Sequence, residues 1–209
     1  MLNLAVFISG RGTNLQAIHK AILEKRLSAK IALVLSSNPD SEGTKWAEKE
    51  GLKTIVCRRS DFKQRGEFVA AMMHHLESSG VDFIVLAGYI RKVPPEVVRR
   101  YRWRIINIHP ALLPLFGGKG YYGIRVHESV LASGAEYTGV TIHFVEEEYD
   151  TGPIIFQFPV KILPGDTPEN LAKRVGEIEH KIYPKILQLF AEGKLPHKIF
   201  DNFSRLTII

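Results

Sequence analysis

The sequence has a single cysteine, Cys57, among its 209 residues. A lone thiol can form no intramolecular disulfide, and a metal site cannot draw on paired thiolates. Histidines and carboxylates are not clustered at ligand spacing either, so we expect no metal. This composition is typical of a protein from a reducing compartment.

Long hydrophobic runs are also missing. The apolar start, residues 1–9, is too short to cross a bilayer, lacks a basic leader and runs into a glycine turn. We therefore expect a buried first strand, a cytoplasmic location and no membrane partner.

Acidic residues are fewer than basic ones, 22 against 28, which favours anionic partners. The basic residues are dispersed without the interleaved aromatic residues of single-strand binders, so we expect small-molecule substrates and no nucleic acid. The 45% hydrophobic and 24% charged composition is that of an ordinary globular protein. Its length predicts a single domain over residues 1–209. Either a monomer or a homodimer is expected.

Short apolar runs rich in β-branched residues alternate with stretches at helical spacing, which predicts an α/β fold around a parallel sheet. We expect strands at residues 4–9, 31–36, 54–57, 81–87 and 105–108, and helices at residues 14–25, 44–50, 65–78 and 94–100.

The second half of the sequence departs from this alternation. Residues 113–125 are rich in glycine, proline and aromatic residues and have no period, which indicates a long loop. A helix at 126–133 precedes two strands, 138–144 and 154–160, that add an antiparallel C-terminal extension. A last helix, capped by Thr167, starts at residue 168 and is kinked by Pro184. The fold class is thus a Rossmann-like, mostly parallel sheet with helices on both faces.

Ser9-Gly10-Arg11-Gly12-Thr13-Asn14-Leu15 directly follows the first strand and opens a helix. Backbone N–H groups and the helix dipole favour an anion there. Leu15 stands where a dinucleotide fingerprint needs a third glycine, and no acidic residue ends the second strand, so a mononucleotide-sized phosphate is expected rather than a nicotinamide. The alternative is that the glycines only make a tight turn.

Asn107 and His109 stand at the end of an apolar strand that Pro110 terminates. Residues two apart project to the same face of a strand, so the amide and the imidazole should lie together at the carboxyl edge of the sheet. Open α/β sheets bind ligands at that edge, which makes the two residues a candidate catalytic pair. A strand-end histidine can equally be structural.

Asp150 lies on the turn between the last two expected strands. A carboxylate near His109 would raise the pKa of the imidazole and make it an acid near neutral pH. The neighbouring Glu146, Glu147 and Glu148 support the simpler interpretation of a solvated acidic turn. Thr141 and His143 share one face of the preceding strand, and we expect His143 to orient a neighbour.

Five segments in this order resemble the phosphoribosylglycinamide formyltransferases, the folate-dependent family of purine synthesis. They are ISGRGTNLQ (8–16), VLAGYIR (85–91), NIHPALLP (107–114), TIHFV with DTGPII (141–145 and 150–155) and EHKIYP (179–184).

The resemblance implies a single formyltransferase domain with a phosphate-binding half, about 1–100, and a folate and catalytic half, about 101–190. It implies transfer of the formyl group from 10-formyltetrahydrofolate, the co-substrate, to the amine of phosphoribosylglycinamide. The catalytic set it implies is Asn107, His109 and Asp150. The remaining implied site residues bind phosphoribosylglycinamide (Gly12, Thr13, Asn14, Leu15 and Gln16 at the phosphate, Glu179 at the ribose) or folate (Arg65, Ile90, Arg91, Lys92, Val93 and Asn107).

The loop at residues 116–126 is longer than in many relatives of this family, with a glycine-rich centre around Lys119. We expect it to close over bound substrates as a lid.

Three other functions remain open at this point. Formyltetrahydrofolate hydrolases and the catalytic domain of methionyl-tRNA formyltransferases resemble the chain around Asn107 and His109, but they carry an extra amino-terminal or carboxyl-terminal domain, respectively. A non-catalytic nucleotide-binding module would need only the phosphate loop and gives no reason for Asn107, His109 and Asp150 to coexist.

Overall fold

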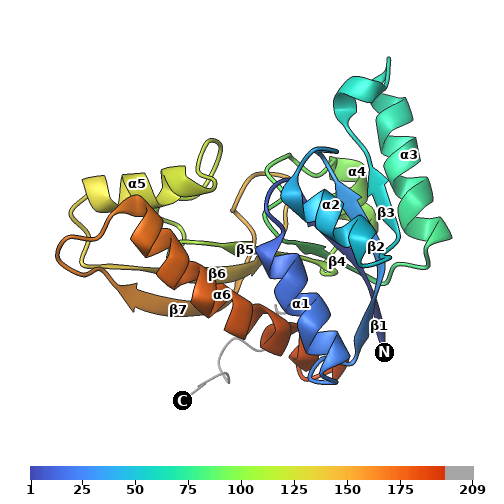
Figure 1. Ribbon diagram of the computed structural model, residues 1–209. Helices are drawn as coiled ribbons and strands as arrows, with labels where there is room; N and C mark the ends of the chain where they lie inside the picture. The colour runs from blue at the N-terminus through green and yellow to red at the C-terminus, as the bar shows by residue number, and fades with distance from the viewer. Residues whose placement is uncertain (196–209) are drawn as a thin grey trace.

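The computed structural model describes residues 1–195 (Figure 1), in which seven strands form one sheet in the order β3-β2-β1-β4-β5-β6-β7. The first five strands run parallel, and β6 and β7 are antiparallel to their neighbours. The expected fold class is thereby confirmed; the part of the predicted domain at 196–209 lies outside the described residues. The strands are β1 Leu2–Ile8, β2 Ala29–Ser36, β3 Thr54–Val56, β4 Phe83–Leu86, β5 Ile105–His109, β6 Tyr137–Phe144 and β7 Ile154–Lys161.

Helices cover both faces of the sheet, so the residues of β1 that point to either face are buried. Leu4, Val6 and Ile8 belong to the hydrophobic core shared with α1, α5 and α6. Ala5 and Phe7 belong to a second core shared with α3 and α4. The helices are α1 Thr13–Leu23, α2 Glu42–Lys49, α3 Arg65–Ser78, α4 Pro95–Arg100, α5 Ile124–Ala132 and α6 Pro168–Ala191, with a short 3₁₀ helix η1 at Arg59–Asp61.

Helix α6 is one helix from Pro168 to Ala191 with Pro184 inside it, as the expectation of a single last helix containing this proline requires. Packing compensates for the proline, since the neighbouring Tyr183 is fully buried and its hydroxyl lies 3.0 Å from the Leu86 carbonyl and 3.2 Å from that of Ile106. The expected cap is present: the Thr167 side chain accepts from the N–H three residues on. None of the helices in residues 1–195 has the length and apolar composition to cross a membrane.

Strand β7 forms one edge of the sheet described here. Pro159 stands opposite Gly139 of β6, and the neighbouring Phe158 is 41% exposed. Proline in a sheet is confined to such edges because it has no N–H to donate to a ladder.

The strand order places the site. Sequence order reverses at β1, which has β2 on one side and β4 on the other. Ligands of open α/β sheets bind beyond the carboxyl ends of the strands at such a switch point. The loop after β1, the segment after β4 and the end of β5 all meet there.

Candidate active site

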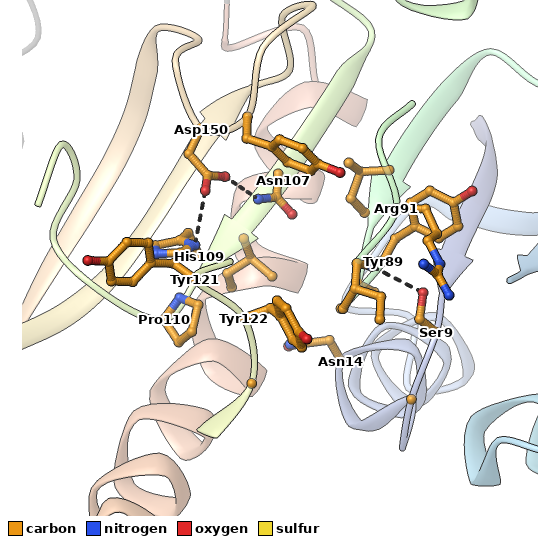
Figure 2. Close-up of a pocket in the computed structure, with 18 of the residues that line it drawn as sticks. Ser9, Asn14, Tyr89, Arg91, Asn107, His109, Pro110, Tyr121, Tyr122 and Asp150 are labelled. Carbon is orange, nitrogen blue, oxygen red and sulfur yellow. Dashed lines mark hydrogen bonds and ion pairs between the residues drawn. The ribbon is translucent and has the colours of Figure 1, made fainter. Parts of the chain in front are cut away.

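A cavity of about 740 Å³ opens at this edge (Figure 2). It is lined from the β1 loop, the segment after β4, the end of β5, the loop before α5 and the β6–β7 turn. The structure thereby brings together most of the residues that the sequence singled out, namely Gly12, Thr13, Asn14, Ile90, Arg91, Lys92, Val93, Asn107, His109, His143, Asp150 and Glu179.

Asp150 lies between Asn107 and His109, with dashed lines to both in Figure 2. The Asn107 Nδ2 atom is 3.4 Å from Asp150 Oδ1, and Asp150 Oδ2 is 3.7 Å from His109 Nδ1. The side chains are largely buried, at 4% exposure for His109 and 11% for Asp150. Asp150, 43 residues after Asn107 in the sequence, therefore meets the strand-end pair Asn107 and His109 in one cavity.

His143 fixes the orientation of the Asn107 amide. Its Nδ1 lies 2.8 Å from the Phe144 carbonyl, which can only accept, so Nδ1 carries the proton. In the neutral ring Nε2 is then an acceptor, and Asn107 Nδ2 donates to it over 3.1 Å. This is the contact that an orienting role for His143 requires.

The tautomer of His109 follows from its two neighbours. Nε2 lies 2.8 Å from the Phe116 carbonyl oxygen, whereas Nδ1 is 3.7 Å from Asp150. Only the shorter distance is within hydrogen-bond range, so the neutral ring carries its proton on Nε2 and donates it to Phe116.

Burial lowers the pKa of His109 below its ordinary value, although Asp150 and the Phe116 carbonyl act in the opposite direction. Asp150 raises this pKa, as expected, but desolvation of the imidazolium is the larger effect and the net pKa is lowered. Burial also disfavours the ionised form of Asp150, but the neighbouring imidazoles of His143 and His109 in their protonated form, together with the Gly118 N–H, outweigh this and lower its pKa.

The loop after β1 depends on two glycines that touch. Gly12 precedes the first turn of α1 with φ of 73°, in the left-handed region. A Cβ at Gly12 would lie 2.8 Å from the Cα of Gly43 at the start of α2, and the Gly43 N–H donates to the Gly10 carbonyl at 3.0 Å. A side chain at either position would push the loop and α2 apart, so this close packing shapes the loop after β1.

Glu179 of α6 reaches the same loop. Its Oε2 accepts from Asn14 Nδ2 at 2.9 Å, and Asn14 Oδ1 is buried with no hydrogen-bond partner within the described part of the chain. Burial raises the pKa of Glu179 to about 7, against smaller opposite effects of Asn14 and Arg11. The pair thus offers an unused acceptor and a carboxyl group that is partly protonated near neutral pH.

Four residues that the sequence proposed for the site do not line the cavity. Leu15, the third residue of α1, is fully buried in the core that α1 shares with β1. Gln16 begins the helical hydrogen bonding, its N–H donating to the Gly12 carbonyl at 2.9 Å. Arg65 pairs with both carboxylate oxygens of Glu96, and Thr141 is buried beneath the segment after β5, where it donates to the Ala111 carbonyl.

Several cavity residues were not proposed from the sequence. Tyr121 and Tyr122 line it from the loop before α5, and Arg125 lines it from the first turn of α5, with its guanidinium 5.2 Å from the centre of the Tyr122 ring. His127 of α5 also lines it, 3% exposed and with Nδ1 unpartnered among the described residues. The aromatic residues in the glycine-rich loop were the available signal. Nothing in the sequence pattern distinguishes the helical His127 from a core residue.

The family model for formyl transferases matches residues 2–187. The chain belongs to the formyl transferase family. The family match confirms the resemblance that the five sequence segments indicate. Within residues 1–195, no group of three or more histidine, cysteine or acidic residues is arranged to hold a metal.

Relatives and solved structures show which members of the family this chain is similar to. The chain is 38% identical to a phosphoribosylglycinamide formyltransferase of Haemophilus influenzae, over 99% of this chain and 94% of that protein. It is 44% identical to a chloroplastic phosphoribosylglycinamide formyltransferase of Arabidopsis thaliana over 92% of this chain, but spans only 66% of that protein. A crystal structure of glycinamide ribonucleotide transformylase 1 from Symbiobacterium toebii superimposes with a TM-score of 0.87 at 40% identity, covering 94% of this chain and 90% of that one.

Proposed function

We propose that this chain is a phosphoribosylglycinamide formyltransferase. It moves the formyl group of 10-formyltetrahydrofolate to the amine of 5-phosphoribosylglycinamide, giving the N-formyl product and tetrahydrofolate, in purine biosynthesis. The observation that carries the proposal is the convergence of Asn107, His109 and Asp150 in one cavity with an anion cradle, in a chain of this family.

The two substrates divide the cavity between them. The phosphate takes the N–H groups of Gly12, Thr13 and Asn14 at the start of α1, where the helix dipole favours an anion. Glu179 receives the ribose hydroxyls, one of which also satisfies the unpartnered Asn14 Oδ1. Leu15 and Gln16 support this turn from behind.

Formylfolate takes the side of the cavity formed after β4, at residues 90–93, and reaches Asn107 with its formyl group. The apolar side chains Ile90 and Val93 lie beside the basic Arg91 and Lys92, a combination that suits an aromatic ring with an anionic tail. Arg65 contributes only if its guanidinium leaves Glu96.

Attack of the amine on the formyl carbon produces a tetrahedral centre with a negatively charged oxygen. Preorganised donors stabilise that oxygen more than water does. Asn107 Nδ2 and His109 Nε2 are the donors, now engaged with Asp150 at 3.4 Å and with the Phe116 carbonyl at 2.8 Å. The negatively charged oxygen therefore takes the place of Asp150 as an acceptor for Asn107 Nδ2, and of the Phe116 carbonyl as an acceptor for His109 Nε2.

Proton transfer completes the reaction. The attacking nitrogen loses a proton, the folate nitrogen gains one, and the C–N bond to folate breaks as the new one forms. Asp150, ionised because its pKa is lowered, accepts the proton directly or through a water molecule, and the proton passes on to the leaving nitrogen. His109, beside Asp150, stabilises the negative charge on the oxygen of the tetrahedral intermediate.

Several narrower expectations belong to the proposal. We expect the protein to act in the cytoplasm as a single formyltransferase domain, a monomer or a homodimer, without metal or nucleic acid. We also expect a phosphate-binding half at about 1–100 and a folate and catalytic half at about 101–190, a division that residues 90–93 cross on the folate side and Glu179 crosses on the ribotide side.

The test is a two-substrate assay that follows the folate product by its ultraviolet absorbance. Product that appears only with both substrates supports transfer. Folate turnover without the ribotide indicates a hydrolase, and no turnover at all favours a binding module. His109→Ala and Asp150→Asn should each lower kcat by about 10²–10³, whereas Glu177→Gln, an exposed change on α6, should have no effect.

A further inference from the structure

The loop between β5 and α5 touches both His109 and Asp150 through its main chain. The Phe116 carbonyl oxygen accepts from His109 Nε2 at 2.8 Å, and the Gly118 N–H donates to Asp150 Oδ2 at 2.8 Å. One three-residue segment therefore contacts two candidate catalytic side chains with a peptide acceptor and a peptide donor.

Gly117, between these two contacts, lies against the side chain of Asp150. A Cβ at this position would be 2.4 Å from Leu113 Cδ2 and 3.2 Å from Asp150 Cβ. Its φ is not in the left-handed region, so backbone conformation does not demand glycine here. What favours glycine is space, because an added methyl group requires the Leu113 side chain to move and the segment and the Asp150 side chain to shift apart.

The backbone on both sides of this contact is strained. Phe116 has φ of 56° and Asp150 has φ of 55°, in the left-handed region that few non-glycine residues adopt. Such conformations persist where the surrounding structure holds them, and they gather at functional sites.

We propose that the main chain of residues 116–118 is a positioning element of the active site, and that Gly117 is the positioning residue that lets it approach. The inference rests on the proposed function. The Phe116 carbonyl keeps the proton of neutral His109 on Nε2, the atom that must later donate to the formyl oxygen. The Gly118 N–H fixes one carboxylate oxygen of Asp150, so that the other faces Asn107.

Gly117→Ala tests the approach directly. The added methyl group displaces both peptide contacts, and we expect kcat to fall about 10- to 100-fold, the effect of losing two positioning hydrogen bonds. KM for both substrates should stay within about threefold of the value for the unaltered protein, because the segment orients catalytic side chains and does not bind the substrates. The matched control is Gly66→Ala on α3, where a Cβ meets nothing within 4 Å and activity should be unchanged.

A second variant separates crowding from loop flexibility. Leu113→Ala removes the side chain that the new methyl group would strike first. The double variant Leu113→Ala/Gly117→Ala should therefore recover at least about fivefold in kcat over Gly117→Ala, with Leu113→Ala alone as the reference. A double variant no faster than Gly117→Ala would overturn the proposal.

Nitrogen-15 spectra of the histidine rings give a second measurement. The His109 signals would not change if the 116–118 segment had only a structural role. The His109 signals, assigned from their loss in His109→Gln, should report the Nε2–H tautomer in the unaltered protein and its loss in Gly117→Ala. Retention of that tautomer, or an unaltered kcat, in Gly117→Ala contradicts the proposal. If the unaltered protein transfers no formyl group, the proposed function fails while the spectra still decide the positioning role.

Discussion

Replacing Glu179 by glutamine should change how stability depends on pH. The carboxyl group is held in a buried environment beside Asn14, which raises its pKa from 4.5 to about 7. An acid whose pKa is raised by folding stabilises the fold fully below its unfolded pKa, and that contribution is lost as pH rises through the folded pKa. The relevant window is therefore from about pH 4.5 to 7.

The size of the effect follows from the shift. A rise from 4.5 to about 7 corresponds to about 3 kcal/mol over the whole window. Between pH 5 and pH 8 the unaltered protein should lose about 2–3 kcal/mol of unfolding free energy relative to Glu179→Gln. The amide keeps an acceptor for Asn14 Nδ2, so the comparison isolates the ionisation.

Urea unfolding at a series of pH values from 5 to 8 measures this difference. Glu177→Gln makes the same change at an exposed position of α6 and should follow the unaltered protein. Parallel curves for Glu179→Gln and the unaltered protein would refute the reasoning, since they would mean that Glu179 ionises as freely as in the unfolded chain.

Three further outcomes are expected. Gly12→Ala, at φ of 73° and with its Cβ 2.8 Å from Gly43, should cost about 1–3 kcal/mol in urea unfolding and raise KM for the ribotide about tenfold with little change for folate. An unchanged KM for the ribotide would mean that this loop does not bind the phosphate. Tyr183→Phe should cost about 1–2 kcal/mol, because the Leu86 and Ile106 carbonyls lose a buried donor; equal unfolding midpoints would contradict this. Bound substrates should protect Lys119 from trypsin if the loop before α5 closes over them, and equal cleavage with and without substrates would remove the lid.

The sequence predicted well what depends on local pattern. Helix α3 has the expected bounds, Arg65–Ser78, because its capping box and the turn after it are local features. Asn107 and His109 lie at one sheet edge, as the two-residue repeat of a strand requires. The sequence also indicates Asp150, on the turn before β7, although no local rule places its carboxylate beside His109.

The remaining features depend on contacts between distant segments. Helix α6 passes Pro184 without a break because Tyr183 is anchored to two strands. Arg65, which the resemblance implies at the folate site, pairs with Glu96, 31 residues away, a contact that no local pattern predicts. The net direction of the His109 pKa depends on how deeply the ring is buried, which a sequence does not state.

Strand β7, with Pro159 beside the half-exposed Phe158, bears on how the protein avoids aggregation. An unpaired strand at the margin of a sheet can recruit a strand from another molecule, most readily where its side chains are apolar. The imino acid leaves one rung without a donor, so a continuous intermolecular ladder cannot form along this margin. Replacing it with valine would complete the rung and make the protein more prone to self-association at high concentration.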